Sequence, residues 1–331
     1  MIAVTDSDRK NRRVMVIGAS GFVGGHLLKC LVDQGYTDLV ATKLPHESIA
    51  PVPGAESRIK IVDLNILHAE DTAAMLGEFR PELLIHLAAQ SSVGLSFSKP
   101  ELTMQINILG SLHILDGIRA AGCQTRLLFI GSSEQYGIIA PSDLPVSEAK
   151  IPVPVSPYAV SKLAVEQLAL VYAKSYEMDV ILVRAFNHIG PGQLPIFVVS
   201  DFARQIVAVE KGLVEPVMRV GDLSARRDFT DVRDIVRGYV ALIEQGCSSE
   251  VYNIGSGVSY EVRDVLSRLL AASSVSIDVQ MDPARIRPVE VPDIRADISK
   301  IRNDTGWSPI LSLDQSLVDV LEYWRQNDGF V

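Results

Sequence analysis

The chain has 331 residues, of which 47% are hydrophobic and 21% charged, and its formal net charge is −9. This length and composition exclude a disordered chain and predict either one large domain or a domain with a smaller lobe. The acidic balance repels nucleic acid and anionic membranes, so we expect neither as a partner, and any anionic ligand needs a local group of cations.

Three cysteines stand at widely spaced positions without a C-x-x-C pair. This spacing favours neither a disulfide framework nor a zinc site, and no metal is expected. The N-terminus lacks the apolar run of a secretory signal, and no stretch has the length to span a bilayer, so we expect a cytoplasmic protein. The polar residues 1–12 are expected to form a disordered lead-in.

From residue 13 the chain alternates short apolar segments with longer helical patterns. The short segments favour strands covered on both faces, at 13–19, 38–43, 58–64, 82–89, 126–132 and 179–186. Helical patterns lie between most of them, at 22–35, 69–79, 100–122 and 156–176. This alternation implies right-handed crossovers and predicts an α/β fold with a doubly wound parallel sheet.

After residue 190 the rhythm changes, beginning with the Pro- and Gly-rich loop IGPGQLP. Helical patterns follow at 197–212, 231–246, 261–274 and 311–327, with short strand-like segments at 217–220 and 251–257. We therefore predict a nucleotide-binding domain at 13–190 and a smaller mixed α/β lobe at 191–331, partly interleaved with the first.

A glycine-rich turn connects the first strand to the first helix, and it consists of Gly18, Ala19, Ser20, Gly21, Phe22, Val23 and Gly24. Gly18 permits a tight turn, Gly21 lets the backbone approach a pyrophosphate, and Gly24 lets the helix pack close to the sheet. The helix N-terminus presents free N–H groups to the phosphates. In the first strand-helix unit of an alternating chain, this turn predicts a dinucleotide site.

The end of the second strand bears on which dinucleotide is bound. An acid there bonds the adenosine ribose of NAD, whereas a cation accepts the 2'-phosphate of NADP. The strand ends on Lys43, without a carboxylate. Lys43 favours NADPH, with NADH as the alternative cofactor, and a solvated surface lysine is the competing interpretation.

The stretch GSSEQYG, residues 131–137, follows the fifth strand. Hydroxyls and a carboxylate at the end of a core strand must find partners. Three interpretations are open: a satisfied turn, a site at which Ser132 helps give a proton to a carbonyl, or a site at which Glu134 removes a proton from carbon.

A tyrosine and a lysine stand at the start of the next helix. Ser156 suits the N-cap and Pro157 the first helical position, so Tyr158 and Lys162 lie one turn apart on one face. A nearby ammonium lowers the pKa of a phenol toward working pH, and Ser132 can hold the substrate oxygen as charge develops on it. The spacing is common by chance, so the prediction depends on its position after GSSEQYG.

In this order, the motifs resemble those of the extended short-chain dehydrogenase/reductases that act on nucleotide sugars. The glycine turn has the G-x-x-G-x-x-G spacing typical of that superfamily, and the resemblance covers nearly all of the chain after residue 13. It implies a Rossmann-type domain with Ser132, Tyr158 and Lys162 as the catalytic set. It also implies that further cofactor contacts come from Asp63, Leu64, Leu87, Ala88, Ala89 and Gln90.

Segments of the C-terminal half narrow the resemblance to the branch that handles GDP-linked 6-deoxymannose sugars: FNHIGPGQ, VGD, RDFTDV, RPVEVP and TGW. Arg227 and Arg287 are candidates to clamp the two phosphates, because guanidinium groups match phosphate oxygens. The resemblance implies that Glu290 contacts the nucleotide ribose. The other implied substrate contacts are Ser91, Ser133, Asn187, Phe197 and Val198.

Within this branch the chain resembles reductases of GDP-4-dehydro-6-deoxy-D-mannose, which implies reduction of the C4 ketone to GDP-D-rhamnose. GDP-mannose 4,6-dehydratases are the alternative, because they keep a carboxylate where this chain has Glu134. Ser132 in place of a threonine, and IGPGQ in place of an acidic, arginine-rich run, favour the reductase. A non-catalytic NADP-binding sensor or scaffold is a further alternative, since fold does not fix function.

Oligomeric state follows from the resemblance alone. Family members usually pair through their fourth and fifth helices, here 100–122 and 156–176, so a homodimer with a four-helix bundle is implied. Burial against the protein's own sheet explains many of the same apolar residues. The sequence leaves open the role of Glu134 and the stereochemistry at C4, which decides between a rhamnose and a 6-deoxytalose product.

Overall fold

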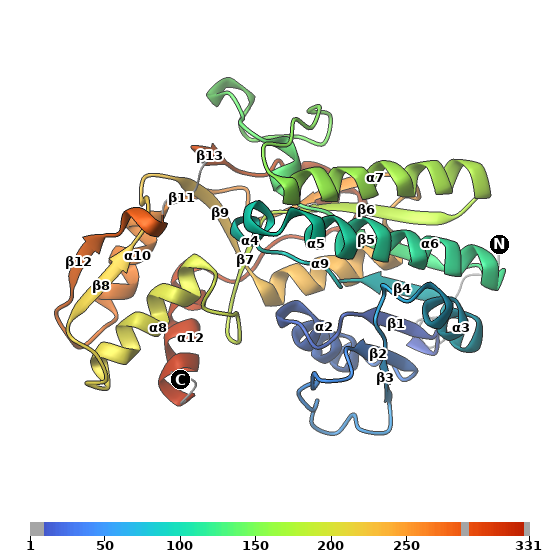
Figure 1. Ribbon diagram of the computed structural model, residues 1–331, viewed down its shortest axis with the longest axis horizontal. Helices are drawn as coiled ribbons and strands as arrows, with labels where there is room; N and C mark the ends of the chain where they lie inside the picture. The colour runs from blue at the N-terminus through green and yellow to red at the C-terminus, as the bar shows by residue number, and fades with distance from the viewer. Residues whose placement is uncertain (1–9, 286–290, 328–331) are drawn as a thin grey trace.

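The computed structural model describes residues 10–285 and 291–327, and a parallel sheet forms its centre (Figure 1). The strands run in the order β10-β6-β5-β4-β1-β2-β3. Their bounds are β1 (Val14–Ile17), β2 (Leu39–Lys43), β3 (Ile59–Asp63), β4 (Leu83–His86), β5 (Arg126–Ile130), β6 (Asp179–Ala185) and β10 (Val251–Ile254). All six strands predicted before residue 190 are confirmed, and the all-parallel pairing matches their continuous apolar character.

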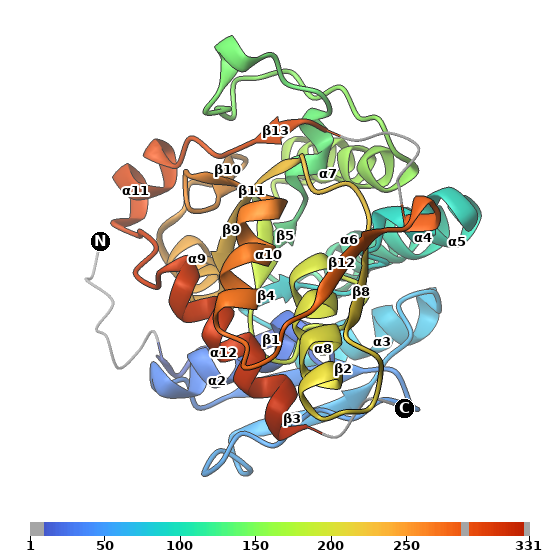
Figure 2. The ribbon, with the colours of Figure 1, turned by 90° about the vertical axis from the view of Figure 1, so that its left-hand side faces the viewer.

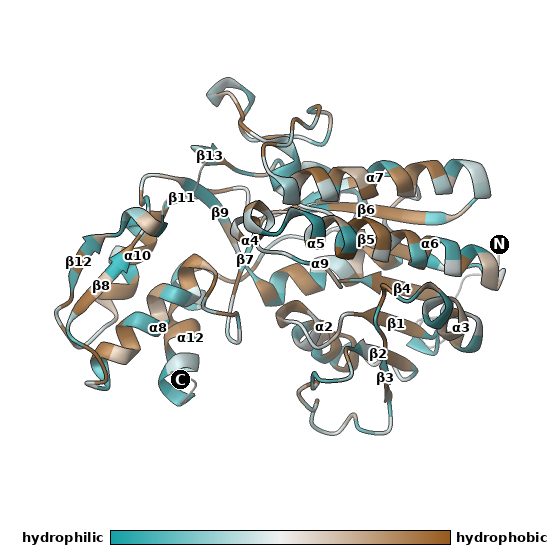
Figure 3. Cartoon of the chain, in the orientation of Figure 1, coloured by the Kyte–Doolittle hydropathy of each residue, from teal (hydrophilic) through white to brown (hydrophobic). Residues whose placement is uncertain are grey.

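Helices cover both faces of the sheet. On one face lie α2 (Phe22–Asp33) and α9 (Val232–Gln245), which pack with Val14 and Val16 of β1. On the other lie α3 (Ala69–Phe79), α6 (Gly110–Ala121) and α7 (Pro157–Tyr176), which pack with Met15 and Ile17. Successive side chains of a strand point to opposite faces, so β1 contributes to both cores. The strands are accordingly among the most hydrophobic segments in Figure 3.

The third strand differs from the expectation that every strand is covered on both faces. β3 is the outermost strand on its side of the sheet, and Lys60 and Ile61 are exposed. β3 pairs with β2 on one side only, and its side chains are incompletely covered.

The predicted helix at 100–122 is divided into three parts. α5 (Pro100–Met104) leads into the π-helix η1 (Gln105–Leu109), which continues as α6. The short α4 (Val93–Ser98) precedes them. Asn107, in the π-helix, is buried, and its side chain bonds both polar groups of the Gln90 backbone and the Ser161 hydroxyl. The widened turn thus anchors the loop after β4 to α7.

The remaining elements form a lobe at the carboxyl end of the sheet (Figure 2). Its strands are β7 (Asn187–Ile189), β8 (Val217–Val220), β9 (Arg226–Asp231), β11 (Ser259–Glu261), β12 (Asp278–Met281) and β13 (Asp293–Ile294). Its helices are α8 (Val198–Glu210), α10 (Val262–Ala271) and α12 (Leu313–Gln326), which share a separate core. The helix α11 (Ser299–Thr305) instead packs beside α9 and β10.

Two elements from beyond residue 190, β10 and α9, belong to the large sheet and its covering helices rather than to the lobe. β10 pairs with β6 at the edge of the large sheet, and α9 packs beside α2. The chain therefore crosses between the two layers more than once. The doubly wound α/β fold with a smaller mixed lobe is confirmed.

Candidate active site

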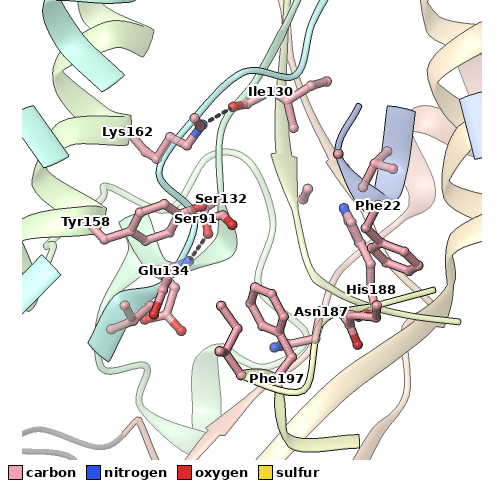
Figure 4. A pocket seen from close by; sticks show the side chains of 18 of the residues that line it. Phe22, Ser91, Ile130, Ser132, Glu134, Tyr158, Lys162, Asn187, His188 and Phe197 are labelled. Atoms are coloured by element: carbon pink, nitrogen blue, oxygen red, sulfur yellow. Dashed lines mark hydrogen bonds between the residues drawn. The ribbon is translucent and has the colours of Figure 1, made fainter. Parts of the chain in front are cut away.

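A cavity of about 810 Å³ lies between the carboxyl ends of the parallel strands and the lobe. Crevices at this edge are where doubly wound folds bind ligands. The loops after β1, β4, β5 and β6 form one wall, and the lobe supplies the other. The large sheet, its helices and their loops contribute Gly18, Gly21, Phe22, Val23, Gly24, Leu87, Ala89, Ser91, Ser132, Ser133, Glu134, Tyr158 and Lys162 to the lining. The lobe contributes Asn187, His188 and Arg285, together with Phe197 just before α8. Figure 4 labels ten of the lining residues.

The glycine turn has the geometry that a dinucleotide needs. Gly18 has a φ of +83°, and a Cβ there would lie 2.6 Å from the backbone nitrogen of Ala88. A Cβ on Gly24 would collide with the carbonyl oxygen of Ala19. The N-cap of α2 is Gly21, and no side chain caps the helix, so its first N–H groups are left for an anion. The turn therefore fits the pyrophosphate of a dinucleotide.

Charged groups cluster beyond this turn, at the ends of β2 and β3. Lys43 Nζ lies 2.5 Å from Asp63 Oδ1 and also donates to the Leu44 and Pro45 carbonyls. The Ser20 hydroxyl donates to Glu47 at 2.5 Å. Leu64 is buried behind them. Lys43 is therefore not an isolated cation, because the carboxylates of Asp63 and Glu47 lie in the same group.

The loop after β4 forms the floor between the glycine turn and the reaction site. Leu87 and Ala89 line the cavity, and the backbone of Ala88 lies against Gly18. Gln90 is buried and turned away from the cavity, because its amide bonds Thr103 and the Ser92 backbone. Gln90 was expected to contact the cofactor, but its side chain does not line the cavity.

Three predicted catalytic residues come together from two elements. Ser132 follows β5, whereas Tyr158 and Lys162 lie in the opening turns of α7, where Ser156 accepts a hydrogen bond from Ala159 N as the expected N-cap. The Ser132 side chain interacts with the Tyr158 phenol and lowers its pKa. Lys162 Nζ donates to the Ile130 carbonyl at 2.9 Å and lies 6.0 Å from the centre of the Tyr158 ring.

Burial sets the protonation of this pair. It raises the pKa of Tyr158 to about 12, against the opposing effect of the Ser132 side chain, and Glu134 raises it further. Burial also lowers the pKa of Lys162 to about 8. The expectation that the ammonium brings the phenol pKa toward working pH is not met in this structure, because desolvation of the phenolate dominates. Tyr158 is a protonated phenol at neutral pH.

Glu134 also faces the cavity, beside Ser132 and Tyr158 (Figure 4). Its backbone N–H donates to the Ser132 hydroxyl oxygen at 3.2 Å. The Glu134 side chain thus lies on the same cavity wall as the Ser132 and Tyr158 side chains. The third interpretation of GSSEQYG, proton removal from carbon, therefore has its group in place as well.

The sequence profile of the family described as GDP-mannose 4,6 dehydratase matches residues 15–320. The chain belongs to this family. A relative from Pseudomonas aeruginosa, named GDP-6-deoxy-D-mannose reductase, is 37% identical over 314 residues, covering 95% of this chain and 97% of that protein. A GDP-mannose 4,6-dehydratase from Vibrio cholerae is 26% identical over 351 residues, covering 94% of this chain and 93% of that protein.

Solved structures agree with this membership of the GDP-mannose dehydratase family. The structure of RMD from Pseudomonas aeruginosa complexed with NADPH has a TM-score of 0.82 at 34% identity, covering 95% of this chain and 99% of that one. UDP-glucose 4-epimerase from Thermus thermophilus, in complex with NAD, has a TM-score of 0.84 at 28% identity over the same shares. The predicted extended short-chain dehydrogenase/reductase family is confirmed.

Some of the predicted substrate residues line the cavity and others do not. Ser91, Ser133, Asn187 and Phe197 line the cavity, and Val198 begins α8 directly behind Phe197. Arg227 is not brought into the lining, because its buried guanidinium donates to the Arg226 and Val291 carbonyls. Arg287 and Glu290 lie outside the described residues.

Arg285 and His188 are among the lining residues that were not predicted as contacts. Arg285 reaches the cavity from the lobe and forms an ion pair with Asp201 at 2.6 Å. It stands two residues before the RPVEVP motif, which was the available signal. His188 bonds the Tyr239 hydroxyl at 3.1 Å, and burial lowers the pKa of His188 to about 4, so it is neutral. Its only signal was its place in FNHIGPGQ.

Residues 10–285 and 291–327 contain neither a cluster of metal ligands nor a membrane-spanning helix. No group of three or more His, Cys, Asp or Glu side chains is arranged to hold a metal ion there. No helix in the same ranges is long and apolar enough to cross a membrane.

Proposed function

We propose that the chain reduces the C4 ketone of GDP-4-dehydro-6-deoxy-D-mannose with NADPH, giving GDP-D-rhamnose. The observation that carries the proposal is the Ser132, Tyr158 and Lys162 set in one cavity with the glycine turn. The similarity to a protein named GDP-6-deoxy-D-mannose reductase supports the choice of substrate. The reaction requires an oxygen-binding site, a proton donor and a site for the hydride carrier, and this cavity has residues for each.

Tyr158 gives its proton to the oxygen that forms at C4, and Ser132 holds that oxygen by a hydrogen bond. The raised pKa of Tyr158, about 12, suits this direction, because the phenol is protonated before the reaction. Lys162 holds the cofactor ribose. The nicotinamide, when bound, supplies the hydride. The protein contributes positioning and electrostatic stabilisation.

For the cofactor we propose NADPH, with NADH as the alternative. The glycine turn binds the pyrophosphate, and Lys43 is the cation available to the 2'-phosphate. Glu47 beside Ser20 opposes a phosphate there, so selectivity depends on the balance of the two charges. NADPH in the Pseudomonas aeruginosa structure supports this choice.

For the sugar nucleotide we propose contacts on the lobe side of the cavity. The net charge of −9 makes local cations necessary for a diphosphate. Arg285 provides one from the cavity wall, and Arg287 follows two residues later. Arg227 supports the wall through the Val291 carbonyl. Ser91, Ser133, Asn187 and Phe197 face the sugar, and Glu290 is proposed for the nucleotide ribose.

A second candidate is GDP-mannose 4,6-dehydratase activity, which Glu134 favours by its place beside Ser132 and Tyr158. The two activities differ in cofactor balance. Reduction consumes NADPH stoichiometrically, whereas the dehydratase reaction returns the cofactor to its starting state.

The test supplies the ketosugar with NADPH and follows its absorbance. We expect one NADPH lost per sugar, and NMR of the product to give the C4 configuration. Tyr158→Phe should remove most turnover and leave NADPH binding nearly unchanged. Release of a 4-keto sugar from GDP-mannose without net cofactor use would replace the proposal with the dehydratase, and NADPH binding without turnover of either sugar would favour a scaffold.

We also propose a homodimer through the faces of α5, η1, α6 and α7. Leu102, Leu109, Val160 and Val171 are apolar residues of these elements that remain exposed. Exposed apolar side chains on neighbouring helices are suited to a four-helix contact. A cytoplasmic location fits a substrate of this class.

A further inference from the structure

Behind the reaction site lies an ion pair that the proposed chemistry does not use. Glu166 on α7 and Arg184 on β6 are joined in bidentate fashion, at 2.7 and 2.9 Å, and are only 3% and 4% exposed. Burying two charges is costly, and such pairs often add little net stability.

A third buried side chain connects this pair to the catalytic loop. Gln135 Nε2 donates to Glu166 Oε2 at 2.8 Å, and Gln135 Oε1 accepts the Ser132 backbone N–H at 2.8 Å. Gln135 is fully buried. The cavity lining includes Ser132, Ser133 and Glu134 but not Gln135, so in the described part of the chain Gln135 acts from behind the wall.

The chemistry of the three groups fixes the orientation of the glutamine. A carboxylate only accepts hydrogen bonds, and an amide donates only through its nitrogen. Because Arg184 donates to both oxygens of the Glu166 carboxylate, those oxygens act as acceptors and must face the Gln135 NH₂ group. The Gln135 oxygen is thereby turned to Ser132, whose backbone donor it satisfies. Glu166 and the Ser132 N–H therefore favour the same orientation of the amide.

The geometry of α7 makes this contact relevant to catalysis. Tyr158, Lys162 and Glu166 follow one another at four-residue steps, so they lie along one helix face. Glu166 thus ties the Ser132 loop to the helix that carries the other two reacting groups. Gly131 allows the close approach, since a Cβ there would collide with Gln135 Oε1.

We propose that Gln135, oriented by the Glu166–Arg184 pair, is a positioning residue that fixes Ser132 relative to Tyr158. The inference rests on the proposed carbonyl reduction at this site. A shift of about 1 Å in a reacting group can cost roughly a hundredfold in rate, so loss of this bond should lower kcat while KM and cofactor affinity stay close to wild type.

The test is a double-mutant cycle of Gln135→Met with Ser132→Ala, measured by NADPH loss. Methionine has nearly the same shape but accepts no comparable hydrogen bond. In the wild-type background, we expect Gln135→Met to lower kcat about 10- to 100-fold. In the Ser132→Ala background, the same substitution should lower kcat by less than about threefold. Additive losses would overturn the proposal, because Gln135 would then act independently of Ser132.

A matched control comes from the next residue. Tyr136→Phe removes a buried hydrogen bond from the same loop, to Asn253 Oδ1 at 2.7 Å, but keeps the ring that lies 4.8 Å from the Arg184 guanidinium and does not touch Ser132. It should reduce thermal stability yet keep kcat within about twofold, and a loss as large as that of Gln135→Met would contradict the proposal. If Gln135→Met does not fold, Glu166→Leu with Arg184→Met replaces it, since removing both charges leaves neither unpaired.

A second measurement does not depend on the substrate. In protein labelled with ¹⁵N-serine, the Ser132 amide should exchange slowly with solvent in the wild type and in Tyr136→Phe. Its exchange should accelerate at least about tenfold in Gln135→Met, because its acceptor is gone. If the Ser132 amide of Gln135→Met exchanged as slowly as that of the wild type, the positioning contact would be refuted, whether or not the wild type reduces the ketosugar. If it exchanged rapidly but the wild type reduced no ketosugar, only the proposed function would be contradicted.

Discussion

At the scale of single residues, burial decides the protonation of the reaction site more than neighbouring charge does. Tyr158 and Lys162 lie one turn apart, which from the sequence suggests that the ammonium acidifies the phenol. In the structure the ammonium donates to the Ile130 carbonyl, and burial shifts both pKa values toward the neutral forms. Tyr158 is thereby protonated at neutral pH, as the proposed role of proton donor requires.

The lowered pKa of Lys162 predicts a pH dependence of cofactor binding. The charged fraction of Lys162 falls as pH rises through about 8, so an ammonium that holds the ribose is lost above that value. We expect the Kd for NADPH, measured by fluorescence titration, to rise up to about tenfold per pH unit above the pKa. Lys174→Met, on the exposed side of the same helix, should keep this profile, and a flat profile to about pH 10 would contradict the role of Lys162.

A second residue-scale prediction concerns Lys43 and Glu47. Lys43→Met should raise the Kd for NADPH about tenfold and change that for NADH little, since a charge-assisted bond to phosphate contributes about 1.5 kcal/mol or more. Glu47→Gln should lower the Kd for NADPH by severalfold. The exposed Glu56→Gln is the control. Equal effects on both cofactors would place the 2'-phosphate elsewhere.

At the scale of elements, the π-helix η1 is the feature that periodicity did not predict. Its extra residue per turn brings Asn107 to the loop after β4, where one side chain satisfies two backbone groups of Gln90 and contacts α7. Sequence periodicity detects a continuous apolar face, which the widened turn preserves. The two flanking α-helices therefore appeared as one.

The stability of this anchor can be measured directly. Asn107→Ala leaves the buried N–H and carbonyl of Gln90 without a partner, at about 1–3 kcal/mol for each group. We expect urea unfolding to show a loss of about 2 kcal/mol or more in the free energy of unfolding. Gln105→Ala, on the exposed side of the same π-helix, should stay within about 0.5 kcal/mol of the wild type. Equal losses would show that Asn107 has no special anchoring role.

At the scale of the whole molecule, segments distant in the chain build both the sheet and the site. β10 and α9 complete the first layer from beyond residue 190, and Arg285 reaches the cavity from the lobe. A truncation after residue 190 would therefore remove β10 and α9 together with the lobe and expose the apolar surface that these two elements cover.

The exposed faces of η1 and α7 predict the oligomeric state. Sedimentation should give a dimer of the 36.1 kDa chain, and Leu109→Asp or Val171→Asp should shift it toward the monomer because a charge would be buried at the contact. Val318→Asp is the matched control, since Val318 and Leu109 are both 43% exposed. A dimer unaffected by both of these helix-face variants would place the contact on another surface.

The first six strands of the large sheet, the glycine turn and the Ser, Tyr and Lys set were predictable from the sequence alone, whereas β7, β9, β11, β12, β13 and α11 were not predicted. Each predicted feature depends on local rules: continuous apolar runs for parallel strands, glycine where a Cβ would collide with Ala88, and a helix turn that places Tyr158 and Lys162 on one face. The tertiary structure decided the incomplete cover of β3, the partners of Lys43 and Arg227, and the pKa values at the site. It also decided the contact of Gln135 with Glu166, because burial and the distances between segments far apart in the chain exist only once the chain is folded.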